Sequence, residues 1–139
     1  MSALVDTGVL VAFYNERDAR HQRAVELVAE LKEGTHGDVF TSDYVFDESI
    51  SLAQARTGRV DVVLAVGGSV FPDSPEDRWV LLLHVSVDEF FRSWGSLKRH
   101  ADARLSFTDW TIVEMVRGRG IDEVVSFDSG LDAWVTRIS

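Results

Sequence analysis

The 139-residue sequence contains no cysteine, which excludes disulfide frameworks, thiolate nucleophiles and cysteine-ligated zinc or iron–sulfur sites. Only two residues are proline and no tract has low complexity, so the composition is that of an ordered globular chain. No basic segment precedes the apolar run Ala3–Val5, and Asp6 interrupts that run, which argues against a signal peptide or a membrane span. We therefore expect a cytoplasmic protein that does not enter a membrane and whose metal ligands would be oxygen or imidazole groups.

Positive charge is also scarce, with 14 Lys and Arg against 23 Asp and Glu and a formal net charge of −9. This charge argues against a general nucleic-acid coat protein, because phosphate neutralisation needs a broad basic surface. A nuclease would need only a local basic rim. Two stretches are candidates, although each is equally well explained as a solvated helix face: Arg17, Arg20 and Arg23, and then Lys98, Arg99, His100 and Arg104.

The length and the 45% hydrophobic content predict a single domain over residues 1–139. Strand-like runs are expected at Ala3–Val5, Val39–Thr41, Trp79–Val85, Val124–Phe127 and Val135–Ile138. Helices are expected after Asp6, around Ala24–Leu31, from Ser42 to Gly58, over Arg59–Val66 and Val87–Arg99, and from Ser106 to Arg119, with a loop from Gly67 to Arg78. Continuous apolar strands separated by helices predict an α/β fold, with a parallel sheet covered on both faces.

Two carboxylates are expected at the carboxyl edge of this sheet, where ligands bind in open α/β folds. Asp6 and Asp128 each follow a predicted strand directly. Asp6 is equally well explained as the N-cap of the next helix, and Asp128 as a turn residue before Ser129–Gly130. Neither residue alone therefore establishes a site.

Glu48 is harder to explain as a surface residue. Val45, Glu48, Ser49 and Leu52 are spaced as one helical stripe, whereas Asp47 lies about 100° round the helix. An inward carboxylate is costly unless it is paired or bound to a metal. The alternative is an edge position that reaches water.

Asp109 repeats this pattern, because it is in register with Ile112, Val113 and Val116. It also follows Ser106 by three residues, so it fits a variant of the helix capping box. The two roles are compatible. Four such carboxylates would repel one another, and a hard divalent cation, Mg²⁺ or Mn²⁺, would relieve that repulsion. Such an ion can activate water for phosphodiester hydrolysis.

Five segments together resemble the PIN-domain family, in particular the VapC-type ribonuclease toxins of toxin–antitoxin pairs. The segments span nearly the whole chain and are Leu4–Thr7, Arg20–Ala24, Thr41–Glu48, Leu105–Asp109 and Val125–Asp128. The resemblance implies a PIN-like (Rossmann-like) sheet, Mg²⁺ or Mn²⁺ dependence, internal cleavage of RNA leaving a 5′-phosphate, and a homodimer. Asp6, Glu48 and Asp109 match the family's best-defined acidic ligands and Asp128 the more variable fourth, with Asp132 as the only substitute.

The chain departs from the family pattern at the bulky Trp110 and in the loop from Gly67 to Arg78. Two other enzyme classes share part of this pattern. Asp6-Thr7-Gly8 is the triplet of aspartic proteases, but it leads into a helical pattern. A haloacid-dehalogenase-like phosphatase would carry an Asp at the position of Gly8. A PIN-like binding module without catalysis is the remaining alternative.

A small antitoxin protein is the expected partner. A basic side chain placed among the carboxylates would replace the charge of the metal ion, so we expect an Arg-bearing segment to dock beside Asp6 and Asp109. Aromatic segments at Phe13–Tyr14, Phe46 and Phe90–Trp94 are candidate docking or dimer surfaces, with core packing as the alternative.

Overall fold

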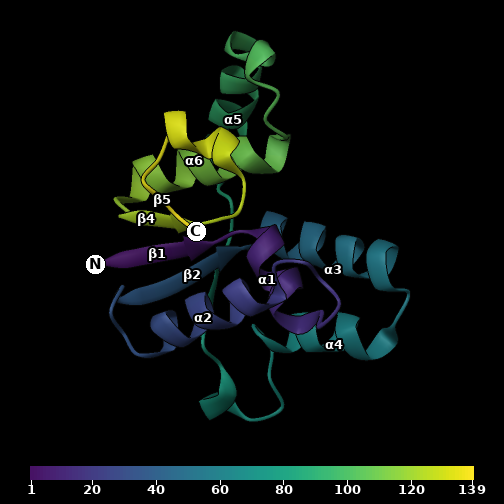
Figure 1. The fold of residues 1–139 in the computed structure, drawn as a ribbon. Coiled ribbons are helices and arrows are strands. Elements are labelled where there is room, and N and C mark those ends of the chain that lie inside the picture. Colours follow the sequence, from purple (N-terminus) through teal and green to yellow (C-terminus); the bar gives the residue numbers. More distant parts are fainter.

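The computed structural model describes residues 1–139 and has a five-stranded parallel sheet at its centre (Figure 1). Across the sheet the strands are β3 (Leu81–Leu83), β2 (Asp38–Ser42), β1 (Ser2–Val5), β4 (Glu123–Val125) and β5 (Arg137–Ile138). Each neighbouring pair is parallel. The predicted α/β class is therefore confirmed.

Six α-helices cover the sheet, and three short 3-10 helices connect elements. The chain runs from β1 to β2 and β3 in one direction and then returns from β3 to β4 on the other side of β1, and right-handed crossovers in opposite directions place the two groups of helices on opposite faces. In Figure 1 one group comprises α1 (Thr7–Tyr14), α2 (His21–Lys32), α3 (Asp43–Thr57) and α4 (Val60–Gly68), and the other α5 (Val87–Arg99) and α6 (Phe107–Arg119). The 3-10 helices are η1 (Pro75–Asp77), η2 (Ala101–Ala103) and η3 (Ser129–Ala133). No helix combines the length and the apolar character needed to cross a bilayer.

The core lies around the neighbouring strands β1 and β4. Ala3–Val5 and Val124 are fully buried, as expected for strands covered on both faces. The predicted stripe of α2 is confirmed, because its buried residues are Ala24, Leu27, Val28 and Leu31.

Helix ends follow the predicted capping residues. Ser42 caps α3 by accepting a hydrogen bond from the backbone N–H of Val45 at 3.1 Å, and Ser106 caps α6. Gly58 and Gly120 end these helices in the left-handed conformation, with φ of 60° and 67°, which favours glycine. These caps fix where Glu48 and Asp109 stand along their helices.

Several boundary predictions were wrong, and the last two predicted strands are shorter than expected, since β4 ends at Val125 and β5 begins at Arg137. The apolar run Trp79–Val85 forms only the short edge strand β3, because its sole strand neighbour is β2 and Leu81 remains 45% exposed. Gly67 and Gly68 belong to the last turn of α4 rather than to a loop, since the helix continues across them before Ser69 ends it. The mixed α/β architecture also disfavours an aspartic protease, whose class is built almost wholly of β-strands.

Candidate active site

All four predicted carboxylates line one cavity of about 540 Å³ at the carboxyl edge of the sheet. Asp6 follows β1, Glu48 comes from α3, Asp109 from the first turn of α6, and Asp128 from the start of η3. The fold thus brings acids from four elements that are distant in sequence to the same cavity. Whether these acids bind a metal or take part in catalysis stays a prediction.

Asp6 is the most deeply buried member of the set, with 6% of its surface exposed. One carboxylate oxygen, Oδ1, accepts a hydrogen bond from the backbone N–H of Thr7 at 2.7 Å, so Asp6 is also the N-cap of α1. Burial raises the pKa of Asp6 from 3.8 to about 6, against the lowering effect of its hydrogen bonds and with help from the charges of Asp109 and Glu48. Asp6 therefore takes up a proton at a higher pH than an ordinary carboxylate does, although it is still mostly ionised at neutral pH.

Ser126 is a functional candidate that sequence reasoning missed. Its buried hydroxyl donates to Asp6 Oδ2 at 2.6 Å and accepts from the backbone N–H of Asp128 at 3.0 Å. One side chain therefore connects two of the four acids. The only available signal was a single hydroxyl residue between apolar residues in the run Val124–Phe127, which is too common to be informative.

Glu48 lies on the inner stripe of α3, as predicted. Its side chain is half-buried, whereas the neighbouring Asp47 is exposed and does not line the cavity. Leu52 and Arg56 follow Glu48 at four-residue intervals and line the same cavity. This face of α3 therefore forms one wall of the site.

Asp109 has the capping role that its position predicted, and it also lines the cavity. It forms a reciprocal capping box with Ser106: its Oδ2 accepts from the Ser106 backbone N–H at 2.9 Å, and its own N–H donates to the Ser106 hydroxyl at 3.0 Å. Burial raises the pKa of Asp109, the capping bonds lower it, and the charges of Asp128 and Glu48 raise it further. The pKa of Asp109 thus depends on the other acids, and the same side chain caps α6.

Asp128 departs from its predicted position directly after a strand, because β4 ends at Val125. It is exposed and instead begins η3, accepting from the Gly130 backbone N–H at 2.8 Å. Asp132, its predicted substitute, does not line the cavity and is held by Arg137, whose Nε lies 2.6 Å from Asp132 Oδ1. The structure therefore favours Asp128 over Asp132 as the fourth acid.

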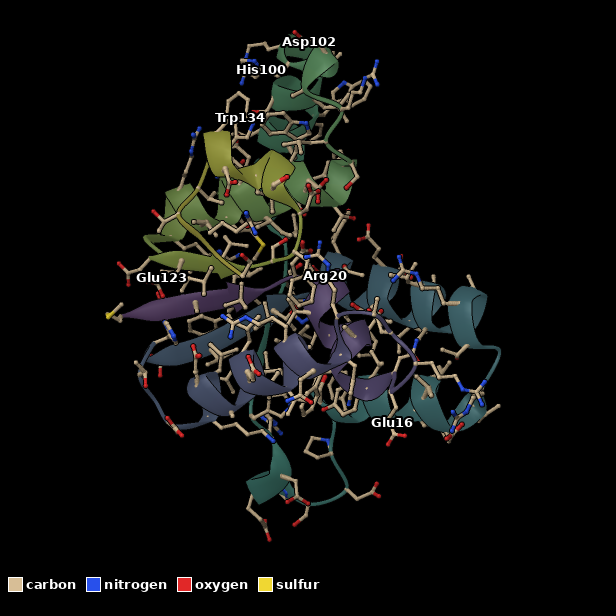
Figure 2. The ribbon with its side chains drawn as sticks, viewed as in Figure 1. Glu16, Arg20, His100, Asp102, Glu123 and Trp134 are labelled. Carbon is tan, nitrogen blue, oxygen red and sulfur yellow. The ribbon has the colours of Figure 1, made fainter.

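The basic rim consists of Arg20 and Arg56. Figure 2 shows Arg20 near the centre of the molecule, where the α1–α4 group and the α5–α6 group meet, with His100 far from it at the upper end. Of the residues predicted for the rim, only Arg20 lines the cavity; the others do not: Arg17, Arg23, Lys98, Arg99, His100 and Arg104. Arg56 was missed because only the fold brings the end of α3 to this cavity.

None of the four acids forms an ion pair with a basic side chain, although such pairs occur elsewhere in the chain. Thr7 also lines the cavity, and its hydroxyl is buried without a hydrogen-bond partner. No three potential ligands in the chain are close enough to form a ready-made metal group. The all-oxygen donors and the uncompensated charge fit a hard divalent cation that keeps several of its waters.

Comparison with known families gives a match over nearly the whole chain. The family model described as PIN domain matches residues 3–134. A VapC ribonuclease of Archaeoglobus fulgidus is 27% identical over 147 residues, covering 96% of this chain and 86% of that protein. The 23S rRNA-specific endonuclease VapC20 of Mycobacterium tuberculosis is 31% identical over 129 residues, covering 93% of this chain and 91% of that protein.

Among solved structures, the crystal structure of M. tuberculosis VapC20, described as a sarcin–ricin loop cleaving toxin, superimposes with a TM-score of 0.82. The aligned residues are 28% identical and cover 98% of each chain. The similarity therefore includes the elements that carry all four acids.

Proposed function

The chain belongs to the PIN domain family, as a member of the VapC-type ribonuclease toxins, and we propose that it cleaves RNA internally with Mg²⁺ or Mn²⁺ held at Asp6, Glu48, Asp109 and Asp128. One observation carries this proposal. Four carboxylates from four elements line a single cavity, and none of them has a basic partner. A purely structural acid at such a site would normally be paired, because unpaired buried charge is costly.

In this mechanism the chain's residues hold and orient charge. Asp6, Glu48 and Asp109 would hold the cation, and Asp128 would complete the site from its exposed edge. The chemistry that a bound cation would supply is polarisation of the phosphate and activation of a water molecule. The Ser126 hydroxyl fixes one oxygen of Asp6, and the Thr7 backbone N–H fixes the other. Asp6 and Asp109 are further restrained because each caps a helix, so the ligand oxygens are oriented before substrate binds.

The proposed substrate is single-stranded or loop RNA, since unpaired bases and their backbone can enter an open cavity. The name of the M. tuberculosis relative, a 23S rRNA-specific endonuclease, supports a ribosomal RNA loop as the first substrate to examine. The designation of its structure as a toxin supports a cognate antitoxin as partner. We further propose that an Arg-bearing segment of this antitoxin neutralises Asp6 and Asp109, and that the toxin acts as a homodimer.

The experiment that tests this function is RNA cleavage by the purified protein. A sarcin–ricin loop oligonucleotide should be cut with Mg²⁺ or Mn²⁺, leaving a 5′-phosphate, and the cut should disappear with EDTA. Asp109→Asn should abolish cleavage, whereas Asp47→Asn, a matched change outside the cavity, should not. Cleavage that persists in EDTA would remove the metal from the proposal, and a folded protein that binds RNA without cutting any substrate would favour a binding module.

A further inference from the structure

Arg20 presents a guanidinium group to the active-site cavity without a carboxylate partner. It lines the cavity and takes part in no ion pair. Arg23, on the next turn of the same segment, instead contacts Glu26 at 3.1 Å and does not line the cavity. Of these two neighbouring arginines, only Arg20 therefore has its charge available to a ligand in the site.

The ring of Phe127 holds this guanidinium in place. The Arg20 Cζ atom lies 4.8 Å from the centre of the Phe127 ring, a distance typical of a cation–π contact. Phe127 stands between Ser126, which binds Asp6, and Asp128. The contact uses the face of the ring, so Phe127 does not occupy the N–H donors of the guanidinium, and Arg20 lines the same cavity as the acids.

The backbone that carries Arg20 is also fixed. The Arg20 N–H donates to Asp18 Oδ1 at 2.9 Å, the Asp18 N–H donates to the Asn15 carbonyl at 3.0 Å, and Asn15 is itself buried. His21 Nδ1 lies 2.7 Å from the carbonyl oxygen of Ala12 in α1. The backbone from which the Arg20 side chain extends is therefore already ordered, so ligand binding would have to order only the side chain.

Arg56 is the other basic residue that lines the cavity. It stands two turns beyond Glu48 on the same face of α3, or about 12 Å along the helix axis. Its Nη1 atom lies 3.6 Å from Asp18 Oδ2, and 53% of its side chain is exposed. Asp18 thus organises both arginines: Oδ1 fixes the backbone of Arg20, and Oδ2 partly neutralises the charge of Arg56.

An RNA strand must approach a chain of net charge −9 and a cavity lined by five carboxylates, including Asp18. Resting on the ribonuclease function proposed above, we propose that Arg20 binds a backbone phosphate next to the cleavage position, with Arg56 as a weaker second phosphate contact. A planar guanidinium suits this ligand because it donates two parallel hydrogen bonds to phosphate oxygens. The sequence of the RNA would not affect this contact.

The test measures RNA binding separately from cleavage. In an Asp109→Asn background, a labelled loop RNA is titrated with protein in Mg²⁺ at several salt concentrations. Arg20→Gln should weaken binding about tenfold and lower the slope of log K against log salt by about 0.7, the value for one single-strand phosphate. Arg23→Gln is the matched control and should change neither quantity. Equal behaviour of the two variants would overturn the inference, even if the wild-type protein cleaves RNA as proposed.

Three further measurements sharpen this result. Arg20→Lys, which keeps the charge, should recover part of the affinity. Asp18→Asn keeps the acceptor for the Arg20 N–H and removes the charge beside Arg56, so it should tighten RNA binding; weaker binding would contradict the assigned role of Asp18. The loss in Arg20→Gln should be the same for loops of different base sequence. A loss confined to one base would show that Arg20 reads a base edge and would overturn the phosphate assignment. An unchanged melting temperature for Arg20→Gln excludes loss of fold as the cause.

Discussion

Asp6→Asn should stabilise the metal-free protein while abolishing RNA cleavage. The carboxylate of Asp6 is buried, and its pKa is raised from 3.8 to about 6. Because the folded state binds this proton more tightly than the unfolded state does, ionised Asp6 opposes folding at neutral and alkaline pH. This destabilisation of the folded state decreases as the pH falls through 6 and disappears below 3.8. Asparagine has the same shape and never ionises.

The size of the effect follows from the pKa difference. At about 1.4 kcal/mol per pH unit, ionised Asp6 lowers the free energy of unfolding by about 3 kcal/mol at pH 8. The substitution also disturbs the hydrogen bond that the Ser126 hydroxyl donates to Oδ2, at a cost of about 1 kcal/mol. Thr7 retains its acceptor, because the side-chain oxygen of asparagine can replace Oδ1. The net gain in stability expected at pH 8 is about 2 kcal/mol.

Urea denaturation at pH 8 and pH 5, in EDTA, measures this effect. The wild-type protein should gain a little over 1 kcal/mol on going from pH 8 to pH 5, and Asp6→Asn should lack that part of the gain. Glu89 has the opposite effect on stability, but only below this pH range. The hydrogen bonds of Arg119 hold the pKa of Glu89 at about 2, below its usual 4.5, so the stability that Glu89 contributes is lost only when the pH falls below 5. Asp47→Asn is the matched control and should change neither stability nor cleavage. If Asp6→Asn were destabilised at pH 8, burial would not be the dominant influence on Asp6 and our reasoning would be refuted.

Three other outcomes are expected. Glu48→Gln should reduce RNA cleavage by at least a hundredfold in a turnover assay, because it removes a proposed ligand charge that Asp47, its exposed neighbour, cannot replace. An equal loss in Asp47→Asn would contradict the placement of Glu48, and not Asp47, on the cavity face of α3. Glu89→Gln should lower the free energy of unfolding by about 3 kcal/mol at pH 7, because Arg119 loses a charged partner at 2.7 Å, and denaturant titration would measure this loss. Saturating Mg²⁺ should raise the melting temperature of the wild-type protein at pH 7 by mass action; an unchanged melting temperature in a thermal shift assay would indicate that the acids act only as caps.

The sequence predicted those features that depend on local pattern. The apolar stripe of α2 and the Ser42 and Gly58 ends of α3 follow from periodicity and capping preferences, which act within a few residues. The same local rule separated Glu48 from Asp47, since a rotation of about 100° distinguishes a residue on the cavity side from one in solvent. Periodicity along the helix is therefore sufficient to identify Glu48, without knowledge of the order of the strands.

Features that depend on the neighbours of a segment were not predictable from the sequence. The run Trp79–Val85 has the composition of a central strand, yet its position at the edge of the sheet leaves only Leu81–Leu83 in the ladder. Ser126 and Arg56 acquire their roles only from side chains more than thirty residues away in the chain, Asp6 and Asp18 respectively. Contacts between side chains so far apart in the chain cannot be predicted from the local pattern of one sequence.

The double use of the acids as helix caps explains why the site can be both anionic and fixed in geometry. Asp6, Asp109 and Asp128 each accept a backbone N–H at the start of a helix, where the partial positive charge of the helix end also favours an anion. For Asp6 these interactions do not offset burial, because its pKa remains raised. Capping therefore orients the carboxylates without neutralising them, and the remaining negative charge is what a divalent cation, or a basic side chain of an inhibitor, would bind. It follows that asparagine, which still caps, isolates the loss of charge, whereas alanine would also remove a cap worth about 1 kcal/mol.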